Sequence, residues 1–238
     1  MANKKPRGYP LSVDLLAKYR DSALANSEEL LAEASLLLAA GHHARSYFLA
    51  VAAIEEVGKA VQAFDGMGRN LSNPAVRSKL QAQFEDHSQK ITFAFNPWLL
   101  ATPNLRSEVM GFVNTMIDVK HGREPSMYTD INPESKEVVT PSNVVRPVAA
   151  KNCIALAHAV LNHAKPYLLS SAPKITTRTQ DAFFALSQST FLKMANTADF
   201  WEFYIARAEA GDSALDTAVT EYHDRLFTKG ILFKSAAE

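Results

Sequence analysis

Two adjacent glutamates, Glu55 and Glu56, lie in the middle of an otherwise apolar segment that runs from Gly41 to Ala63. Every residue from Tyr47 to Ile54 is apolar, which is typical of a helix in a protein core rather than on a surface. Neighbouring helical residues point about 100° apart, so we do not expect both carboxylates to reach open water. Because buried charge is costly unless it is paired, the pattern predicts basic partners elsewhere in the chain or a cleft lined by this helix.

Candidate partners lie on a later segment with helical periodicity, where His87 falls within an apolar stripe and Lys90 follows three residues on. We predict that Glu55 or Glu56 meets His87 and Lys90, with Arg45 as a further candidate. This charge cluster could be an active site or a ligand site. It could equally be a structural ion network that fixes how the helices pack, because such networks gather the same groups.

The two glutamates are expected to differ in their surroundings. Glu55 and Lys59 are four residues apart in the order that favours an ion pair on a helix surface. Glu56 falls on the face that carries Leu49, Ala53 and Ala60, so it is predicted to point inward. Replacing Glu56 is therefore expected to cost more stability than replacing Glu55.

The elements that must position these residues are predicted to be helices throughout. Ser12 can cap the first helix, Gly41 ends it, and proline or glycine separates the later apolar stripes. The predicted helices span 12–40, 41–64, 74–95, 102–122 and 149–164, and after Pro173 they span 180–195, 199–208 and 213–227. Asn96-Pro97 is expected to stop the third helix. The segment 123–140 is predicted to be a long irregular loop, which is typical of a functional or disordered segment.

This pattern predicts an all-α protein with two parts. Residues 12–172 are expected to form an antiparallel helical bundle, and residues 173–238 an aromatic-rich helical extension packed on it. The chain carries 25 basic and 25 acidic residues, so a general attraction to nucleic acid or acidic membranes is not indicated. A single cysteine, Cys153, excludes an internal disulfide and fits a reducing compartment. No signal peptide and no segment of about 20 apolar residues is evident, so we expect a cytoplasmic protein without a membrane partner.

Three segments together resemble the AbiV family of bacterial abortive-infection proteins, which is grouped with the HEPN superfamily of all-α proteins. They are GHHARSYFLAVAAIEEVGKA, then FEDHSQKI, then GREPSMYTDIN. The family pattern is Glu-Glu-x-Gly-Lys, then His-x-x-Lys, then Tyr-x-Asp. The residues that match it in this chain are Glu55, Glu56, Gly58, Lys59, His87, Lys90, Tyr128 and Asp130. The resemblance covers about residues 12–170 and implies a HEPN-like bundle, a homodimer and a role in stopping phage multiplication.

The resemblance also implies ribonuclease activity, because many HEPN proteins are metal-independent ribonucleases. Their signature is an arginine and a histidine with four to six residues between them, and this chain has no such pair. The nearest pair is Lys151 and His158, seven residues apart on one helix face. In a ribonuclease, His158 would act as general acid or base on the 2′-hydroxyl, and Lys151 would hold the phosphate. Lysine is a poorer phosphate ligand than arginine, and the alternative is a solvated or dimer-facing stripe.

The other candidate groups are less specific. His42 and His43 could bind a metal at a helix start, but such pairs more often face solvent. Arg123, Tyr128 and Asp130 lie at the predicted loop, where Tyr128 could close the edge of the core and Asp130 could cap a turn instead of forming a site. No zinc-ligand spacing is present, and we expect neither a metal nor a cofactor.

We therefore expect an abortive-infection protein that blocks phage multiplication, with RNA or the translation machinery as its possible target. Two alternatives stay open. One is a non-catalytic helical interaction protein regulated by a phage-encoded partner, and the other is a metal-dependent enzyme that uses the Glu/His cluster.

Overall fold

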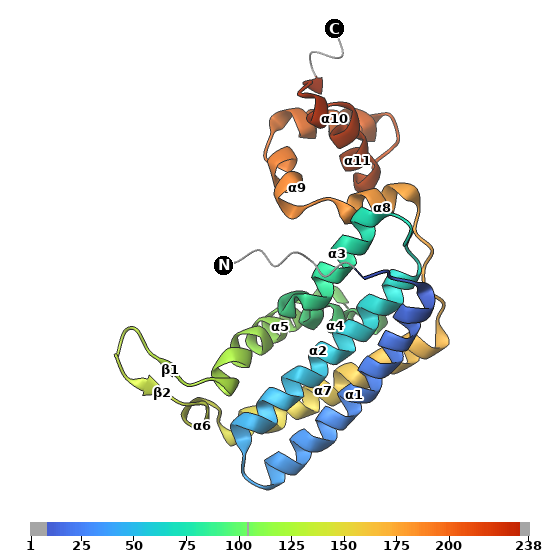
Figure 1. The fold of residues 1–238 in the computed structure, drawn as a ribbon. Coiled ribbons are helices and arrows are strands. Elements are labelled where there is room, and N and C mark those ends of the chain that lie inside the picture. Colours follow the sequence, from blue (N-terminus) through green and yellow to red (C-terminus); the bar gives the residue numbers. More distant parts are fainter. Residues whose placement is uncertain (1–8, 104, 234–238) are drawn as a thin grey trace. The chain divides into compact units, whose positions relative to one another are not determined.

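The computed structural model of the protein describes residues 9–103 and 105–233 and is helical over most of its length (Figure 1). The predicted all-α class is confirmed, with further helices after residue 173. The chain forms two compact units, Met1–Met67 with Leu80–Lys174, and Gly68–Lys79 with Ile175–Glu238. Within the described residues, no helix combines the length and the apolar character that crossing a membrane requires.

The first unit is a bundle of long helices joined by short connections (Figure 1). Its helices are α1 (Val13–Ala39), α2 (His43–Met67), α4 (His87–Ala101), α5 (Leu105–Met127), the short α6 (Pro141–Val144) and α7 (Pro147–Ser170). Helix α3 (Pro74–Glu85) begins in the second unit and ends in the first. Ser12 caps α1 as expected, since its side chain accepts a hydrogen bond from the Leu15 N–H at 3.1 Å.

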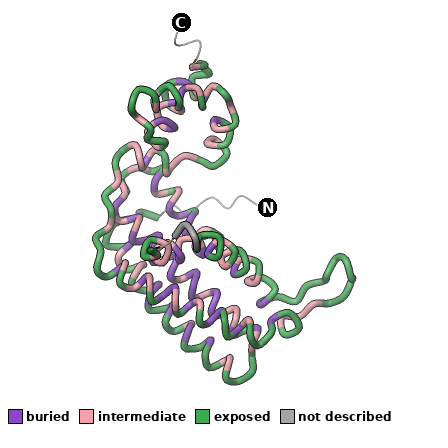
Figure 2. The backbone as a smooth tube through the Cα atoms, turned by 180° about the vertical axis from the view of Figure 1, so that it is seen from behind, coloured by how far each residue is buried: buried purple, intermediate pink, exposed green. Residues whose placement is uncertain are grey.

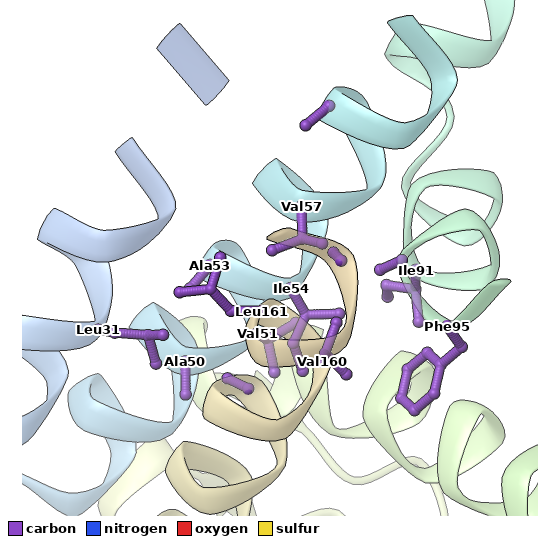
Figure 3. Close-up of a cluster of buried hydrophobic side chains, with 14 of the residues drawn as sticks. Leu31, Ala50, Val51, Ala53, Ile54, Val57, Ile91, Phe95, Val160 and Leu161 are labelled. Atoms are coloured by element: carbon purple, nitrogen blue, oxygen red, sulfur yellow. The ribbon is translucent and has the colours of Figure 1, made fainter. Parts of the chain in front are cut away.

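Helix α2 is the centre of the bundle and packs against α1, α4, α5 and α7. Buried positions run along its whole length, and Figure 2 shows them concentrated in the long helices. Its apolar side chains lie among residues of three other helices (Figure 3): Leu31 of α1, Ile91 and Phe95 of α4, and Val160 and Leu161 of α7. The helix is therefore buried over most of its surface, as its sequence predicts, and a stripe of Phe48, Ala52, Glu56 and Lys59 is partly exposed.

A glycine sets the distance between α2 and α4. A Cβ atom added at Gly58 would lie 1.9 Å from the backbone carbonyl oxygen of Lys90. No side chain fits there. The close approach of the two backbones therefore requires glycine at residue 58. This close approach brings the first turn of α4 beside the middle of α2.

The segment predicted as a third helix over 74–95 is two helices, and the predicted stop at Asn96-Pro97 is wrong. The chain breaks at Asp86, whose extended backbone and side chain cap α4 by accepting from the Gln89 N–H at 3.0 Å. Helix α4 then continues through Pro97 to Ala101. The break makes His87 the first residue of α4, where its side chain is free to turn toward α2.

The predicted loop over 123–140 is also corrected. Helix α5 passes Gly122 and Pro125 and ends at Met127. Two short strands follow, β1 (Asp130–Ile131) and β2 (Val138–Val139), which pair antiparallel with Asp130 opposite Val139. This hairpin is exposed over nearly its whole length (Figure 2).

The second unit is a smaller helical body. Its helices are α8 (Arg178–Ala185), α9 (Gln188–Ala195), α10 (Ala198–Glu209), α11 (Leu215–Arg225) and the 3-10 turn η1 (Phe227–Lys229). Its apolar core includes Met194, Phe200 and Tyr222. The buried carboxylate of Asp181 joins the two chain segments of this unit, accepting from the Asn70 N–H at 2.9 Å and from Arg69 Nη1 at 3.2 Å. The packing of residues 173–238 on the bundle stays a prediction.

Candidate functional site

The carboxylate of Glu55 lies in the bundle, 8% exposed, and three basic side chains converge on it. His87 Nδ1 lies 2.7 Å from Oε2, Arg123 Nε lies 2.7 Å from Oε1, and Lys90 Nζ lies 3.4 Å from Oε2. These groups come from three helices, α4 supplying His87 and Lys90 and α5 supplying Arg123. We call Glu55, His87, Lys90 and Arg123 the Glu55 cluster.

Two glycines lie next to residues of the cluster, one on α2 and one on α5. Gly58, one turn after Glu55, lets α4 approach and so places His87 and Lys90 against the carboxylate. On the other side, a Cβ at Gly122 would lie 2.2 Å from the hydroxyl oxygen of Tyr47, so this glycine leaves room for the tip of an α2 side chain just before Arg123. Gly58 therefore sets the distance between α2 and α4, and Gly122 makes space for Tyr47 beside Arg123.

His87 is the most accessible member of the cluster, with half of its side chain exposed (50%). A carboxylate only accepts hydrogen bonds, so Nδ1 of His87 carries a hydrogen atom and donates a hydrogen bond to Glu55. The other ring nitrogen, Nε2, lies 3.5 Å from Arg123 Nη2. A histidine oriented by a carboxylate, with its second nitrogen beside a guanidinium, is an arrangement suited to proton transfer next to an anion.

Lys90 is the buried cation of the cluster, with its side chain only 6% exposed. Burial lowers the pKa of Lys90 below its usual value, and the nearby charges of Lys59 and Arg123 act in the same direction. The Glu55 carboxylate opposes this shift without cancelling it. Lys90 thus depends on Glu55 as its counter-charge, because an unpaired buried ammonium would be costly.

The expected division of roles between the two glutamates is wrong. Glu55 is the buried one, whereas Glu56 is partly exposed and pairs with Lys59 three residues on. The ion pair predicted between Glu55 and Lys59 is therefore replaced by one between Glu56 and Lys59. Because apolar residues surround both glutamates in the sequence, the helical wheel of α2 alone could not tell which glutamate faces basic neighbours.

Arg45, Tyr128 and Asp130 make no contact with the cluster among the described residues. Arg45 is exposed at the start of α2. Tyr128 is 53% exposed and does not close the core edge. The side chain of Asp130 accepts from the Ile131 N–H at 2.8 Å, within the hairpin. Arg123, which sequence reasoning placed only at the loop, is the missing member of the cluster.

Lys151 and His158 both lie exposed on α7. No hydrogen bond or ion pair with a described residue orients either side chain. They share a helix face, as their spacing predicts. Their catalytic role stays a prediction.

The residues of the cluster do not suit a metal ion. Across the described residues, no group of three or more His, Cys, Asp and Glu side chains is arranged to hold one. Glu55 and His87 are accompanied by Lys90 and Arg123, whose positive charges would oppose a bound cation. The net charge of Lys90 and Arg123 against Glu55 favours an anion over a cation beside His87.

The fold and this cluster define an all-helical bundle whose polar centre is held between three helices. The family model HEPN_AbiV, described as AbiV, matches residues 15–162, which span α1 to the greater part of α7. The chain belongs to the AbiV family of the HEPN superfamily. No curated protein and no solved structure matches the chain. Membership of this family suggests a role in abortive infection.

Proposed function

We propose that the protein is an abortive-infection effector that blocks phage multiplication by acting on RNA, and that the Glu55 cluster is its reactive site. One observation carries the proposal: the imidazole of His87 is oriented by Glu55 and has Arg123 beside its second nitrogen. We further propose that the protein works in the cytoplasm.

The reaction proposed for this site is cleavage of a phosphodiester through the neighbouring 2′-hydroxyl. His87 Nε2 removes the proton of the 2′-hydroxyl, and the resulting oxygen attacks the adjacent phosphorus. A 2′,3′-cyclic phosphate forms as the bond to the 5′-oxygen breaks, and that oxygen takes a proton from solvent. Arg123 offers its guanidinium to the phosphate charge, and Glu55 stabilises the imidazolium as it forms.

The absence of an arginine close before a histidine in the sequence does not count against this proposal. Arg123 and His87 are 36 residues apart, yet their side chains lie 3.5 Å apart. An arginine is also better suited than Lys151 to bind a phosphate. Arg123 already donates to Glu55 through Nε and to Glu124 through Nη1, so Nη2, beside His87, is the nitrogen it offers to the phosphate. The Glu55 cluster therefore places a histidine next to an arginine, whereas the Lys151 and His158 pair has a lysine in the place of the arginine.

The test is RNA cleavage by the purified protein, with and without a chelator. We expect chelator-resistant cleavage that ends in 2′,3′-cyclic phosphates and that His87→Ala reduces by at least about 100-fold, the lower limit for loss of a general base. His121→Ala, an exposed histidine on the neighbouring α5, is the matched control and should cleave normally. Full cleavage by a folded His87→Ala variant would overturn the proposal, and loss in Lys151→Ala/His158→Ala alone would move the site to α7.

A homodimer forms part of this proposal through the family resemblance, and light scattering on the purified chain tests it. A second candidate function is binding of a phage-encoded partner without catalysis. It is favoured by the hairpin, where Ile131 and Val138 are 63% and 64% exposed. If this candidate is correct, Ile131→Ser/Val138→Ser abolishes protection against phage whereas His87→Ala retains it.

A further inference from the structure

The hairpin joins the bundle beside a cavity of about 570 Å³. The walls of this cavity are the first turns of α2, the end of α5 and the start of α6. Tyr128 lines it two residues before β1, and Pro141 lines it two residues after β2. None of the four residues of the Glu55 cluster does. The cavity is therefore a separate feature at the base of the hairpin.

The cavity offers hydrogen-bond donors that the chain itself does not use. Arg45 lines it, no carboxylate does, and Arg45 makes no hydrogen bond or ion pair with any described residue. Nδ1 of His43 is shielded from solvent and also has no partner among the described residues. Buried polar atoms are nearly always satisfied, so an unpaired one in a cavity wall indicates a missing binding partner.

The start of α2 adds backbone donors to this wall. The N–H groups of His43, Ala44 and Arg45 form its first turn, and no described residue accepts a hydrogen bond from them. The first N–H groups of a helix and the positive end of its dipole favour a bound anion. With the guanidinium and the imidazole beside them, they make this end of the cavity suited to a negatively charged oxygen group.

The rest of the wall indicates which anion fits. Phe48, Met127 and Pro141 supply apolar surface. Arg45 is the one permanently charged residue of the lining, and it balances the single charge of a carboxylate. A phosphate monoester carries about −1.5 to −2 at pH 7 and would stay partly unpaired. A carboxylate next to an apolar side chain is the chemistry of the last residue of a polypeptide.

The hairpin supplies a place for the residues that precede such a terminus. Strands β1 and β2 form a two-stranded sheet, so each has one edge without a strand partner among the described residues. Ile131 and Val138 are exposed on it. A free strand edge can pair with an extended peptide. A peptide that runs along the hairpin toward the bundle brings its end to the cavity.

We propose that this cavity binds the C-terminal residue of a partner protein. The α-carboxylate accepts from Arg45, from Nδ1 of His43 and from the first N–H groups of α2. The last side chain, which is apolar, packs on Phe48 and Met127, and the preceding residues extend along the hairpin. The inference rests on the second candidate function, partner binding, and is independent of the proposed cleavage, because it needs neither His87 nor a broken bond.

Calorimetric titration of the full chain with short peptides tests the proposal. The probes are acetylated pentapeptides, Lys-Thr-Val-Thr followed by Leu, Val, Ile or Phe, each as the free acid and as the C-terminal amide. We expect saturable binding of at least one free acid. Its amide should bind about tenfold more weakly or less, because charge-assisted hydrogen bonds are lost. N-acetylleucine, which lacks the preceding chain, should also bind about tenfold more weakly or less.

Variants assign the binding to the cavity and the hairpin. Arg45→Ala should weaken binding of the free acid about tenfold or more, whereas Arg146→Ala, an exposed arginine outside the lining, should bind as the parent does. Ile131→Ser/Val138→Ser should weaken it about fivefold or more. His87→Ala should bind normally, so a failed cleavage test and a failed peptide test are distinguishable.

Three results would overturn the proposal. They are a lack of saturable binding by all four free acids, equal affinity for acid and amide, and parental affinity in a folded Arg45→Ala protein. Equal affinity for N-acetylleucine and the pentapeptide would assign the cavity to a small organic acid and so exclude a protein terminus.

Discussion

At the scale of single residues, the candidate site is organised around one carboxylate, that of Glu55. Glu55 is buried and has three basic partners, whereas Glu56 is partly exposed and has one. The sequence shows that a charge in this helix must be paired, because the surrounding residues are apolar. It does not show which glutamate is paired with α4, because that depends on the position of a neighbouring helix.

Replacing Glu55 should destabilise the protein much more than replacing Glu56. Glu55→Ala removes the counter-charge of buried Lys90 and is expected to cost about 3–5 kcal/mol of unfolding free energy. Glu56→Ala removes one partly exposed ion pair and is expected to cost at most about 1 kcal/mol. Urea unfolding of both variants measures the difference. Equal free energies of unfolding would show that Lys90 does not depend on Glu55.

The cap of α4 should give a pH-dependent stability. Partial burial raises the pKa of Asp86, but hydrogen bonds from the backbone and side chain of Gln89 outweigh it and hold the pKa below its usual value. A carboxylate with a lowered pKa in the folded state contributes stability above its unfolded pKa and loses it as pH falls through the folded one. Asp86→Ala should therefore cost about 1 kcal/mol at about pH 6, and less near pH 3.

Asp86→Asn is the matched variant for this cap, because asparagine also accepts from the first turn of a helix. Its cost should be small and should not change with pH. Urea unfolding of both variants at the same two pH values provides the comparison. An Asp86→Ala cost that stays constant over this range would exclude a role for the ionised carboxylate in the cap.

At the scale of helices, the contact between α2 and α4 determines whether the cluster forms. A methyl group at Gly58 would meet the backbone of Lys90, which cannot turn aside as a side chain can. Gly58→Ala is therefore expected to cost about 1–3 kcal/mol or more and to displace His87 from Glu55. Thermal unfolding measures the first effect, and the NMR chemical shifts of the His87 ring report the second.

Gly111 is the matched control for Gly58. It also lies within a helix, α5, but an added Cβ there would meet nothing within 4 Å. Gly111→Ala should leave the protein unchanged or more stable by up to about 1 kcal/mol, because alanine favours the helix. If both glycine variants unfold at the temperature of the parent, close packing at residue 58 does not matter.

Most helix positions could be predicted from apolar stripes and caps. The points at which a helix breaks or continues were predicted less well. Asp86 breaks the predicted third helix because it caps α4, although His87 and Phe84 fit one continuous stripe. Pro97 and Pro125 lie inside helices although proline disfavours such positions. The hairpin near Asn132 escaped prediction because its strands have two residues each, too few for a period-two pattern.

At the scale of the whole molecule, the site is assembled from residues that are far apart in the chain. Glu55 and His87 were predicted to be candidates because both are polar groups in apolar stripes. Arg123 follows 68 residues after Glu55 at a helix end rich in polar residues, so nothing in its neighbourhood marks it as a partner. Only the packing of α5 on α2 brings it to the carboxylate, and a single sequence carries no signal for that packing.

The Glu55 cluster is proposed to carry out the defence against phage, and one measurement tests this most directly. It is the efficiency of phage plating on cells that express the parent protein, His87→Ala or His121→Ala at equal levels. We expect the parent and His121→Ala to reduce plating to the same extent, and His87→Ala to plate phage as cells without the gene do. Full protection by a folded His87→Ala protein would contradict the claim.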